Sequence, residues 1–315
     1  MAAVRSVCTL NATTEPAAEA SVGSQVPKSK VWELDFCSRP ILDERGKKVW
    51  ELLICDPQRS FEYAQFFPNN KINSAELKAA LEALLQQPGA VRPEKVRFFR
   101  GQMQTIISRA LADLDLTPVP TRRCFALIGW LEDRLESVYK SHPGYSDKAA
   151  SPFTLELGAP LELPDRLRGE AWNFVQLPLE VLQQELRDVE RGSIFGGSLD
   201  LQQALRRQVP PDTMIPGVAV YSRRAGALAA WTNSLELAAV SADTDRAFLI
   251  LDTGVNQRWR YGGYRRTVET TAEANSWEEA KQAVGGLHFL AIQENEDAEG
   301  CAGLWLLLDR KPPNI

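Results

Sequence analysis

The order in which apolar patterns of different period follow one another most limits how this chain can fold. Between residues 31 and 100, three strand-like runs are followed by one run with helical spacing and then by a fourth strand-like run. The strand-like runs are 31–36, 49–56, 61–68 and 95–100, and the helical run is 74–85. Strands that alternate with helices in this way predict an α/β fold.

The pattern continues with a helix over 102–114 and a continuous apolar run within "RCFALIGWL", which we interpret as a buried strand. The last hundred residues repeat the order loosely: strands at 247–252, 258–264, 287–293 and 303–309, and a helix at 276–284. Ser276 and Glu279 have the spacing of a capping box at the start of that helix. We therefore predict two similar α/β halves, built as ribonuclease-H-like mixed sheets with flanking helices.

Composition shifts divide the chain into four parts. Residues 1–30 are poor in large apolar side chains and are either a disordered tail or the remnant of a transit peptide. Residues 31–140 form an N-terminal α/β domain and residues 213–315 a C-terminal one. Prolines interrupt residues 141–212, which we expect to be an irregular middle segment with one helix, "PLEVLQQELRDVE".

The composition excludes several classes of function. A net charge of −5 excludes a protein that is basic all over. Two histidines, and five widely spaced cysteines without a CxxC pair, predict neither a metal site nor a disulfide framework, and we expect reduced thiols. No cofactor motif is present, and no apolar run is long enough for membrane insertion.

One short stretch departs from this acidic balance. Residues 256–266 read "NQRWRYGGYRR", with four arginines and three aromatic residues but no acidic residue. Arginines can bind phosphates and flat rings can stack on bases, so the stretch is a candidate for binding single-stranded RNA. On a strand, Trp259 and Tyr261 would face inward. The candidate RNA-binding residues are Arg258, Arg260, Tyr264, Arg265 and Arg266; the alternative is a solvated strand edge.

A second basic stretch, residues 92–109, contains only one acidic residue, Glu94. Its candidate RNA-binding residues are Lys95, Arg97 and Arg100, and Arg122 and Arg123 add charge nearby in the sequence. The alternative is an ordinary solvated face.

An enzymatic alternative uses the predicted ribonuclease-H-like order. Asp35 on the first strand and Glu76 at the first helix could hold divalent metal ions for a nuclease. The fourth strand, however, supplies Arg100 and Gln102 where such a site needs another carboxylate. We therefore predict no catalytic residues, no metal site and no enzymatic activity.

Several motifs together resemble one family. They include "VWELDFCSRPILDERGKKVWELLICD", "FFPNNKINSAELK", "RFFRGQMQTII", "AWNFVQLP", "IPGVAV", "LAAWTN", "GGLHFLAIQ" and "WLLLD". In this order they are similar to a family of chloroplast RNA-binding proteins, with cyanobacterial relatives, that activate translation of a photosystem I message. The resemblance covers about residues 31–310.

The resemblance implies an RNA-binding factor of the chloroplast stroma that supports synthesis of PsaB and photosystem I biogenesis. Its implied partners are mRNA, in particular a 5′ untranslated region, and other translation factors. A protein scaffold for photosystem assembly, with indirect RNA association, remains a third possibility.

Overall fold

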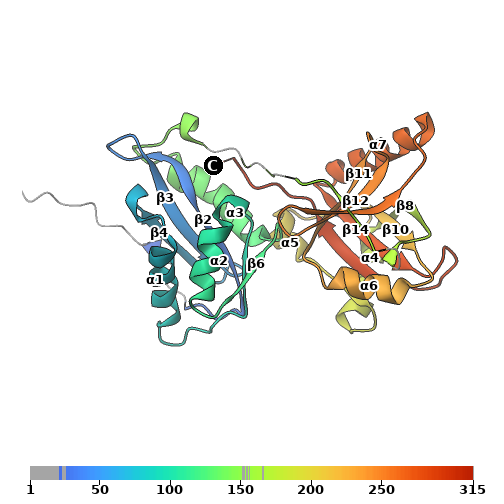
Figure 1. The fold of residues 1–315 in the computed structure, drawn as a ribbon, viewed down its shortest axis with the longest axis horizontal. Helices are drawn as coiled ribbons and strands as arrows, with labels where there is room; N and C mark the ends of the chain where they lie inside the picture. Colours follow the sequence, from blue (N-terminus) through green and yellow to red (C-terminus); the bar gives the residue numbers. More distant parts are fainter. Residues whose placement is uncertain are drawn as a thin grey trace, which may run out of the picture.

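The computed structural model describes residues 21–22, 26–150, 153, 155, 157–164 and 167–314. They form two lobes (Figure 1), with a six-stranded sheet in the N-terminal half, up to residue 150, and two sheets in the C-terminal half, residues 157–308. Helices flank the mixed sheets of both halves, which confirms the predicted α/β class. Most of residues 1–30, the expected tail or transit-peptide remnant, lies outside the described residues.

The N-terminal sheet has the strand order β1-β4-β3-β2-β5-β6. Its strands are β1 (Ser21–Val22), β2 (Val31–Leu42), β3 (Lys48–Cys55), β4 (Glu62–Phe67), β5 (Lys95–Phe98) and β6 (Thr117–Pro120). The strands β2, β3 and β4 are antiparallel, whereas β5 and β6 continue the sheet in parallel. The crossover helices are α1 (Ser74–Leu85) and α2 (Gln104–Ala112). The predicted order of three strands, a helix and a fourth strand is confirmed.

Both faces of this sheet are buried, which explains the unbroken apolar run in β3. Leu52 and Ile54 pack into the core that contains the apolar residues of α1 and α2. Leu53 and Cys55 point to the opposite face and pack into a second core with Leu127. A strand covered on both faces loses the apolar–polar alternation of a half-exposed strand.

The apolar run "RCFALIGWL" is a helix, α3 (Phe125–Arg134), and our strand prediction is wrong. One side of α3 packs on the N-terminal sheet, and Arg206 of the C-terminal half packs against Gly129 on another side. A helix buried nearly all round shows no amphipathic period, so a short apolar run does not distinguish it from a strand. The buried carboxyl of Glu33 accepts a hydrogen bond from the Leu127 amide in the first turn, at 2.9 Å.

The C-terminal half divides its strands between two sheets. The five-stranded sheet has the order β8-β10-β14-β15-β9: Ala171–Pro178, Met214–Tyr221, Leu287–Gln293, Gly303–Leu308 and Phe195–Gly197. The four-stranded sheet has the order β11-β12-β13-β7: Leu237–Asp243, Phe248–Thr253, Gln257–Gly263 and Leu161–Glu162. The helices are α4 (Leu179–Glu190), α5 (Leu201–Leu205), α6 (Ala225–Asn233) and α7 (Val268–Ala283). The two halves therefore share the α/β class but not the strand order.

The helix α7 begins eight residues before the predicted capping box. Thr267 is its N-cap, and the Thr267 and Thr270 hydroxyls each accept a hydrogen bond from the other residue's backbone N–H. Ser276 and Glu279 lie inside the helix, so their capping role was predicted wrongly. The earlier start was missed because two threonines replace the Ser/Thr and Glu/Gln pair that a capping box usually shows.

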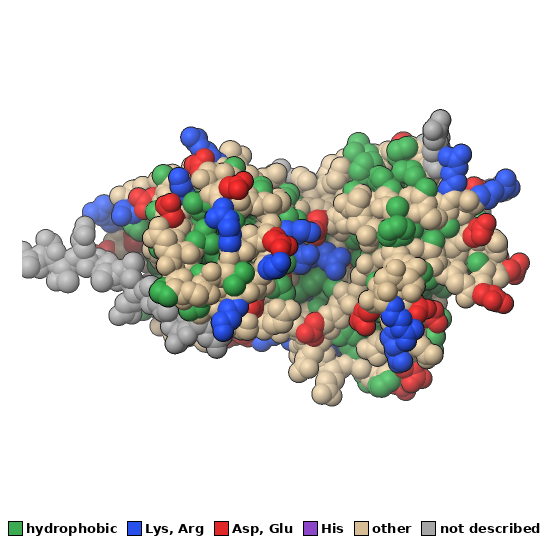
Figure 2. Space-filling model, turned by 90° about the horizontal axis from the view of Figure 1, so that it is seen from below, with side chains coloured by type: hydrophobic (Ala, Val, Ile, Leu, Met, Phe, Trp, Pro, Cys, Tyr) green, Lys and Arg blue, Asp and Glu red, His purple; other side chains and the backbone are tan. Residues whose placement is uncertain are grey.

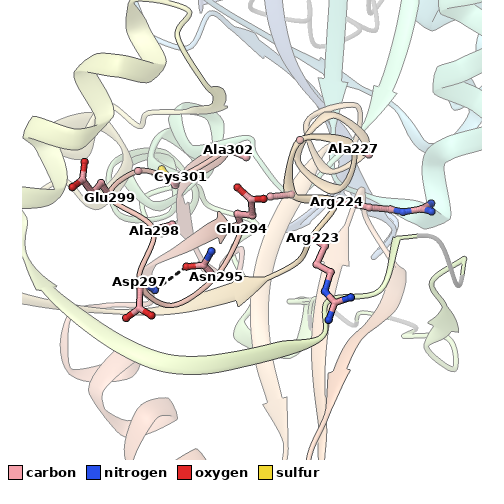
Figure 3. Close-up of a pocket in the computed structure, with 13 residues that line it drawn as sticks. Arg223, Arg224, Ala227, Glu294, Asn295, Asp297, Ala298, Glu299, Cys301 and Ala302 are labelled. Carbon is pink, nitrogen blue, oxygen red and sulfur yellow. Dashed lines mark hydrogen bonds between the residues drawn. The ribbon is translucent and has the colours of Figure 1, made fainter.

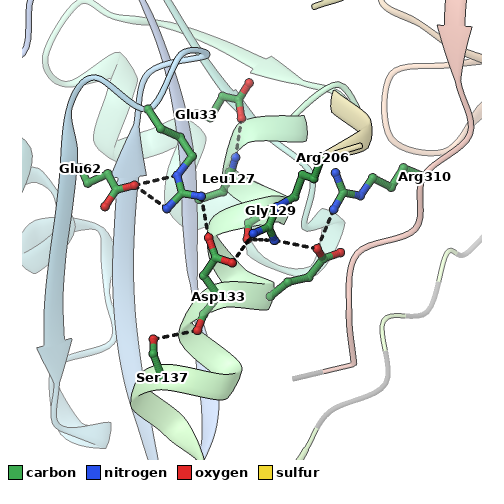
Figure 4. Close-up of polar contacts among 10 residues, drawn as sticks. Glu33, Glu62, Leu127, Gly129, Asp133, Ser137, Arg206 and Arg310 are labelled. Carbon is green, nitrogen blue, oxygen red and sulfur yellow. Dashed lines mark hydrogen bonds and ion pairs between the residues drawn. The ribbon is translucent and has the colours of Figure 1, made fainter. Parts of the chain in front are cut away.

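Arginines of the C-terminal half bind carboxylates of α3 where the two lobes meet. Figure 4 shows Arg206 reaching Asp133 and the Gly129 carbonyl, the latter at 2.9 Å. Arg310 binds Glu132 at 2.6 Å, because the chain after β15 turns back toward the N-terminal half (Figure 1). These ion pairs, which we call the α3 clasp, link the lobes, and Phe125 of α3 also packs on the apolar core of the C-terminal half.

No helix in the described part of the chain is long and apolar enough to cross a membrane. The thiols of Cys37, Cys55, Cys124 and Cys301 are free, and Cys8 lies outside the described residues.

Candidate nucleic-acid interface

Two of the three aromatic residues of the basic–aromatic stretch, Trp259 and Tyr261, pack on the core, as predicted. Tyr261 is 3% exposed, and its hydroxyl lies 2.8 Å from the Thr232 hydroxyl. Trp259 packs edge-on against Trp231, with ring centroids 5.2 Å apart, and donates a hydrogen bond to Thr253. These rings are part of the fold and are unavailable for stacking on bases.

The two arginines of β13 are engaged by acidic residues. Arg258 binds Asp252 of the neighbouring strand β12 at 3.1 Å. Arg260 binds Glu162 of β7 at 2.8 Å, and its guanidinium lies 3.7 Å from the centre of the Phe248 ring. The sequence stretch contains no acidic residue, but its strand neighbours supply the missing carboxylates.

The strand ends at Gly263, after an irregularity in the pairing of β12 with β13, so Tyr264, Arg265 and Arg266 do not continue its faces. Tyr264 is half-buried, with its ring edge-on to Trp172. Burial raises the pKa of the Tyr264 hydroxyl. Arg265 and Arg266 are exposed, and Arg266 donates a hydrogen bond to the Asp245 carbonyl at 3.1 Å. We call these three residues the β13 corner.

The second basic stretch separates into three different environments. Lys95, at the start of β5, is exposed. Arg97 is half-buried and lies 3.9 Å from Glu236 of the C-terminal half. Arg100, just after β5, is buried and binds Asp35 at 2.6 Å. The three side chains therefore do not form one surface.

The contacts of Arg100 also bear on the nuclease alternative. Asp35 is almost fully buried, and both its oxygens are bound by guanidiniums: Oδ1 by Arg100 and Oδ2 by Arg39, the latter at 2.9 Å. Burial opposes ionisation, but Arg100 and Arg39 together hold the pKa of Asp35 below its ordinary value. A carboxylate held in this way has little capacity left for a divalent cation.

Glu76 lies in the first turn of α1, half-buried. Among the residues that the structure describes, no group of three or more His, Cys, Asp or Glu side chains could hold a metal ion.

The structure brings together four arginines that the sequence did not connect. Arg122, in the loop after β6, binds Asp252 of β12 at 2.9 Å, so Asp252 is shared between Arg122 and Arg258. Arg123 lies near Arg97 and Glu236, and burial, followed by the charge of Arg97, lowers its pKa. We call Arg97, Arg122, Arg123 and Arg258 the interlobe arginines. The adjacent arginines at 122–123 were a visible signal, but their partners lie more than a hundred residues away.

A hollow in the C-terminal half lies where β10 and β14 end, between the start of α6 and the loop over 294–302. Figure 3 shows Arg223 and Arg224 on one side, with the Arg224 side chain directed away from the loop. The loop side carries Glu294, Asp297 and Glu299. This mixed charge does not favour a polyanion.

Comparison with known proteins covers both halves of the chain. Residues 31–134 match the family model described as "RNA-binding protein Tab2/Atab2 N terminal", and residues 150–308 match that described as "RNA-binding protein Tab2/Atab2, C-terminal domain".

Two relatives match over nearly the whole chain. The Zea mays "Protein TAB2 homolog, chloroplastic" is 52% identical over 284 residues, which are 90% of this chain and 73% of the relative. The Arabidopsis thaliana protein of the same description is 47% identical over 292 residues, 93% of this chain and 78% of the relative.

A solved structure of the simian T-cell lymphotropic virus intasome with the PP2A regulatory subunit B56 gamma contains a similar chain. That chain is 14% identical, with a TM-score of 0.26 over 41% of this chain and 48% of that one, which is too low to support an argument.

Proposed function

Since the chain belongs to the Tab2/Atab2 family of RNA-binding proteins, we propose that it is a chloroplast RNA-binding factor that activates translation of the photosystem I message for PsaB. The observation that carries the proposal is the match of both halves to the two domains of this family, in order. The chloroplastic descriptions of both relatives support the location, and we propose the stroma as the compartment. Other translation factors are proposed partners.

We propose that the protein acts by binding RNA and not by cleaving it. The guanidiniums around Asp35 support this, because they already neutralise the carboxylate that a nuclease would need. An acidic protein that binds RNA must do so through local basic patches, and its affinity must fall as salt rises.

We expect the purified protein to bind RNA from the 5′ untranslated region of the PsaB message more tightly than a scrambled RNA of equal length and base composition. Affinity should fall linearly on a log–log plot against salt, by about 0.7 in slope for each phosphate contact to a single strand. Filter binding at several salt concentrations measures both quantities.

Three results would contradict the proposal in different ways. Equal affinity for the scrambled RNA would contradict recognition of this message, and no affinity for naked RNA would favour a protein scaffold. Cleavage of the labelled RNA with magnesium or manganese, lost in Asp35→Asn, would instead restore the nuclease alternative.

Among the residues predicted from the sequence, we propose the β13 corner as one part of the RNA surface, with Lys95 as a further contact. Arg265 and Arg266 are exposed, whereas Arg260 and Arg100 are each ion-paired and Arg258 shares Asp252 with Arg122. The half-buried Tyr264 supports the corner through its packing on Trp172.

Replacing Arg265 and Arg266 together by Gln should weaken RNA binding and flatten the salt slope by roughly 1.4, which corresponds to two lost phosphate contacts. The fold should be unchanged, because both side chains are exposed. In a matched control, Gln replaces Arg187, in the last turn of α4, and Arg191, the C-cap of that helix. If the corner variant keeps wild-type affinity and slope, the corner is a solvated edge.

A further inference from the structure

The interlobe arginines carry more positive charge than the carboxylates around them can neutralise. Arg122 and Arg258 share the single carboxylate of Asp252. Among the described residues Arg97 has one ion pair, with Glu236 at 3.9 Å, and Arg123 lies beside Arg97. In the part of the chain that the structure describes, these four guanidiniums therefore form ion pairs with two carboxylates, so positive charge exceeds paired negative charge at this place.

A third carboxyl near Arg97, that of Glu33, reduces this excess only in part. Its environment is the buried first turn of α3, where it accepts the Leu127 hydrogen bond. Burial raises the pKa of Glu33 to about 7, so near neutral pH a large fraction of it is uncharged.

Several donors of the interlobe arginines are also unused. The Nε atoms of Arg97 and Arg122 are buried without a hydrogen-bond partner in the part of the chain that the structure describes. Within the same described residues, the Arg123 guanidinium has neither an ion pair nor a hydrogen bond. Unpaired buried donors are costly, and they are rare unless water, a ligand or an ion completes them.

The position in the fold also favours a ligand. Arg97 lies near the carboxyl end of β5, and Arg122 and Arg123 follow the carboxyl end of the parallel strand β6. In open α/β sheets, ligands bind outside the carboxyl ends of the strands. On the face shown in Figure 2, basic and acidic side chains lie side by side where the two lobes meet.

A groove of about 620 Å³ adjoins the interlobe arginines, with Glu236 and Arg258 in its wall. The amide side chains of Gln104, Asn256 and Gln257 also line it. Arginine forks fit phosphate oxygens, and amides can form hydrogen bonds with the edges of unstacked bases. The groove thus offers both kinds of contact that single-stranded RNA needs.

We propose that the interlobe arginines bind a backbone phosphate of single-stranded RNA, whose adjoining nucleotide enters this groove between the lobes. The proposal rests on the proposed RNA-binding function and assigns it a site that both halves of the chain build. Asp252 and Glu236 hold the arginines in place before RNA arrives, and Arg123 supplies a guanidinium that has no ion pair among the described residues.

The test compares Arg123→Gln with wild type, using a short labelled single-stranded RNA at several salt concentrations. Arg123 has no ion pair among the described residues, so its replacement leaves no carboxylate there without its cationic partner. We expect affinity to fall about tenfold, as for a lost hydrogen bond to a charged group, and the salt slope to flatten by about 0.7. Arg191→Gln, at an arginine paired with Asp188 on the exposed end of α4, makes the same charge change as a control.

Arg123→Lys separates charge from geometry. It should keep the wild-type salt slope and lose part of the affinity, because lysine retains the charge but not the planar fork. A folded Arg123→Gln with wild-type affinity and slope would overturn the proposal. If Arg123→Gln does not fold, wild-type affinity in Arg123→Lys overturns it instead.

A second measurement distinguishes failure of the site from failure of the proposed function. Tripolyphosphate should raise the melting temperature of the wild type, at matched ionic strength, more than that of Arg123→Gln, because it binds only the folded site. If tripolyphosphate acts in this way but the wild type binds no RNA, the RNA-binding function and the RNA assignment fail together. If RNA binds but tripolyphosphate stabilises both proteins equally, the proposed function stands and this site is wrong.

Discussion

Replacing Arg39 by Met should lower the free energy of unfolding by about 3–5 kcal/mol, the cost of removing one partner from a buried ion pair. Arg39 is fully buried on β2. Its Nε donates to Glu51 and its Nη1 to Asp35, both at 2.9 Å. Methionine fills a similar volume, so little cavity should form. The lost free energy of unfolding would therefore come mainly from the two buried carboxylates that lose a cationic partner.

The remaining partners of these carboxylates soften the effect only in part. Asp35 would keep Arg100, and Glu51 would keep Arg134 and the Tyr139 hydroxyl. Removing the charge of one of these carboxylates should therefore restore part of the stability. We expect the double variant Arg39→Met with Glu51→Gln to be more stable than Arg39→Met alone, even though it carries a second substitution in the core.

Urea unfolding followed by circular dichroism measures both variants. Arg191→Met, at an exposed ion pair, is the control and should change stability by no more than about 1 kcal/mol. A loss in Arg39→Met as small as that of the control would show that the buried network contributes little.

Raising the pH from about 5 to about 8 should destabilise the wild type by roughly 3 kcal/mol relative to Glu33→Gln. Burial raises the pKa of Glu33 from 4.5 to about 7, and the Leu127 amide and Arg97 oppose this shift only in part. Between these pH values the folded protein holds a proton that the unfolded chain has released.

The sign follows from this difference in bound protons. The free energy of unfolding falls with rising pH wherever the folded state binds more protons, so the cost is absent below about pH 4.5 and complete above about pH 7. The glutamine side chain of the variant cannot ionise, and its carbonyl can still accept the Leu127 hydrogen bond. Asp35, whose pKa is lowered, loses its contribution only as the pH falls below its ordinary range, outside this window.

Urea unfolding of both proteins at several pH values tests the effect. Glu279→Gln, at an exposed position of α7, controls for the loss of a carboxylate. Parallel stability curves for the wild type and Glu33→Gln across this pH range would contradict a buried, partly protonated Glu33.

Sequence patterns predicted correctly those elements that have one buried side and one exposed side. The helix over 74–85 has a buried and an exposed side, and its predicted start at Ser74 is confirmed. The prediction for α3 was wrong because both lobes cover this helix, so its sequence shows no periodic alternation of apolar and polar residues. The strand β3 was predicted correctly although both its faces are buried, but the apolar run of α3 is about as short, so length alone does not distinguish the two.

The candidate interface was harder to predict, because its electrostatics depend on pairing between distant segments. Nothing near Arg260 in the sequence reveals Glu162, which reaches it only because β7 lies beside β13. In the same way, Arg122 meets Asp252 across the boundary between the lobes. Local sequence showed where positive charge is concentrated, whereas the topology determined which of those charges are already neutralised.

The α3 clasp has a consequence for any salt titration of this molecule. Arg206 and Arg310 join the lobes through exposed or half-buried ion pairs, which dissolved ions screen. Added salt therefore acts twice: it competes with the protein for the polyanion, and it loosens the joint across which the polyanion would lie. A curved plot of affinity against salt would then report a change in molecular shape as well as displaced counterions. The hydrodynamic radius of the free protein, followed over the same range of ionic strength, separates the two.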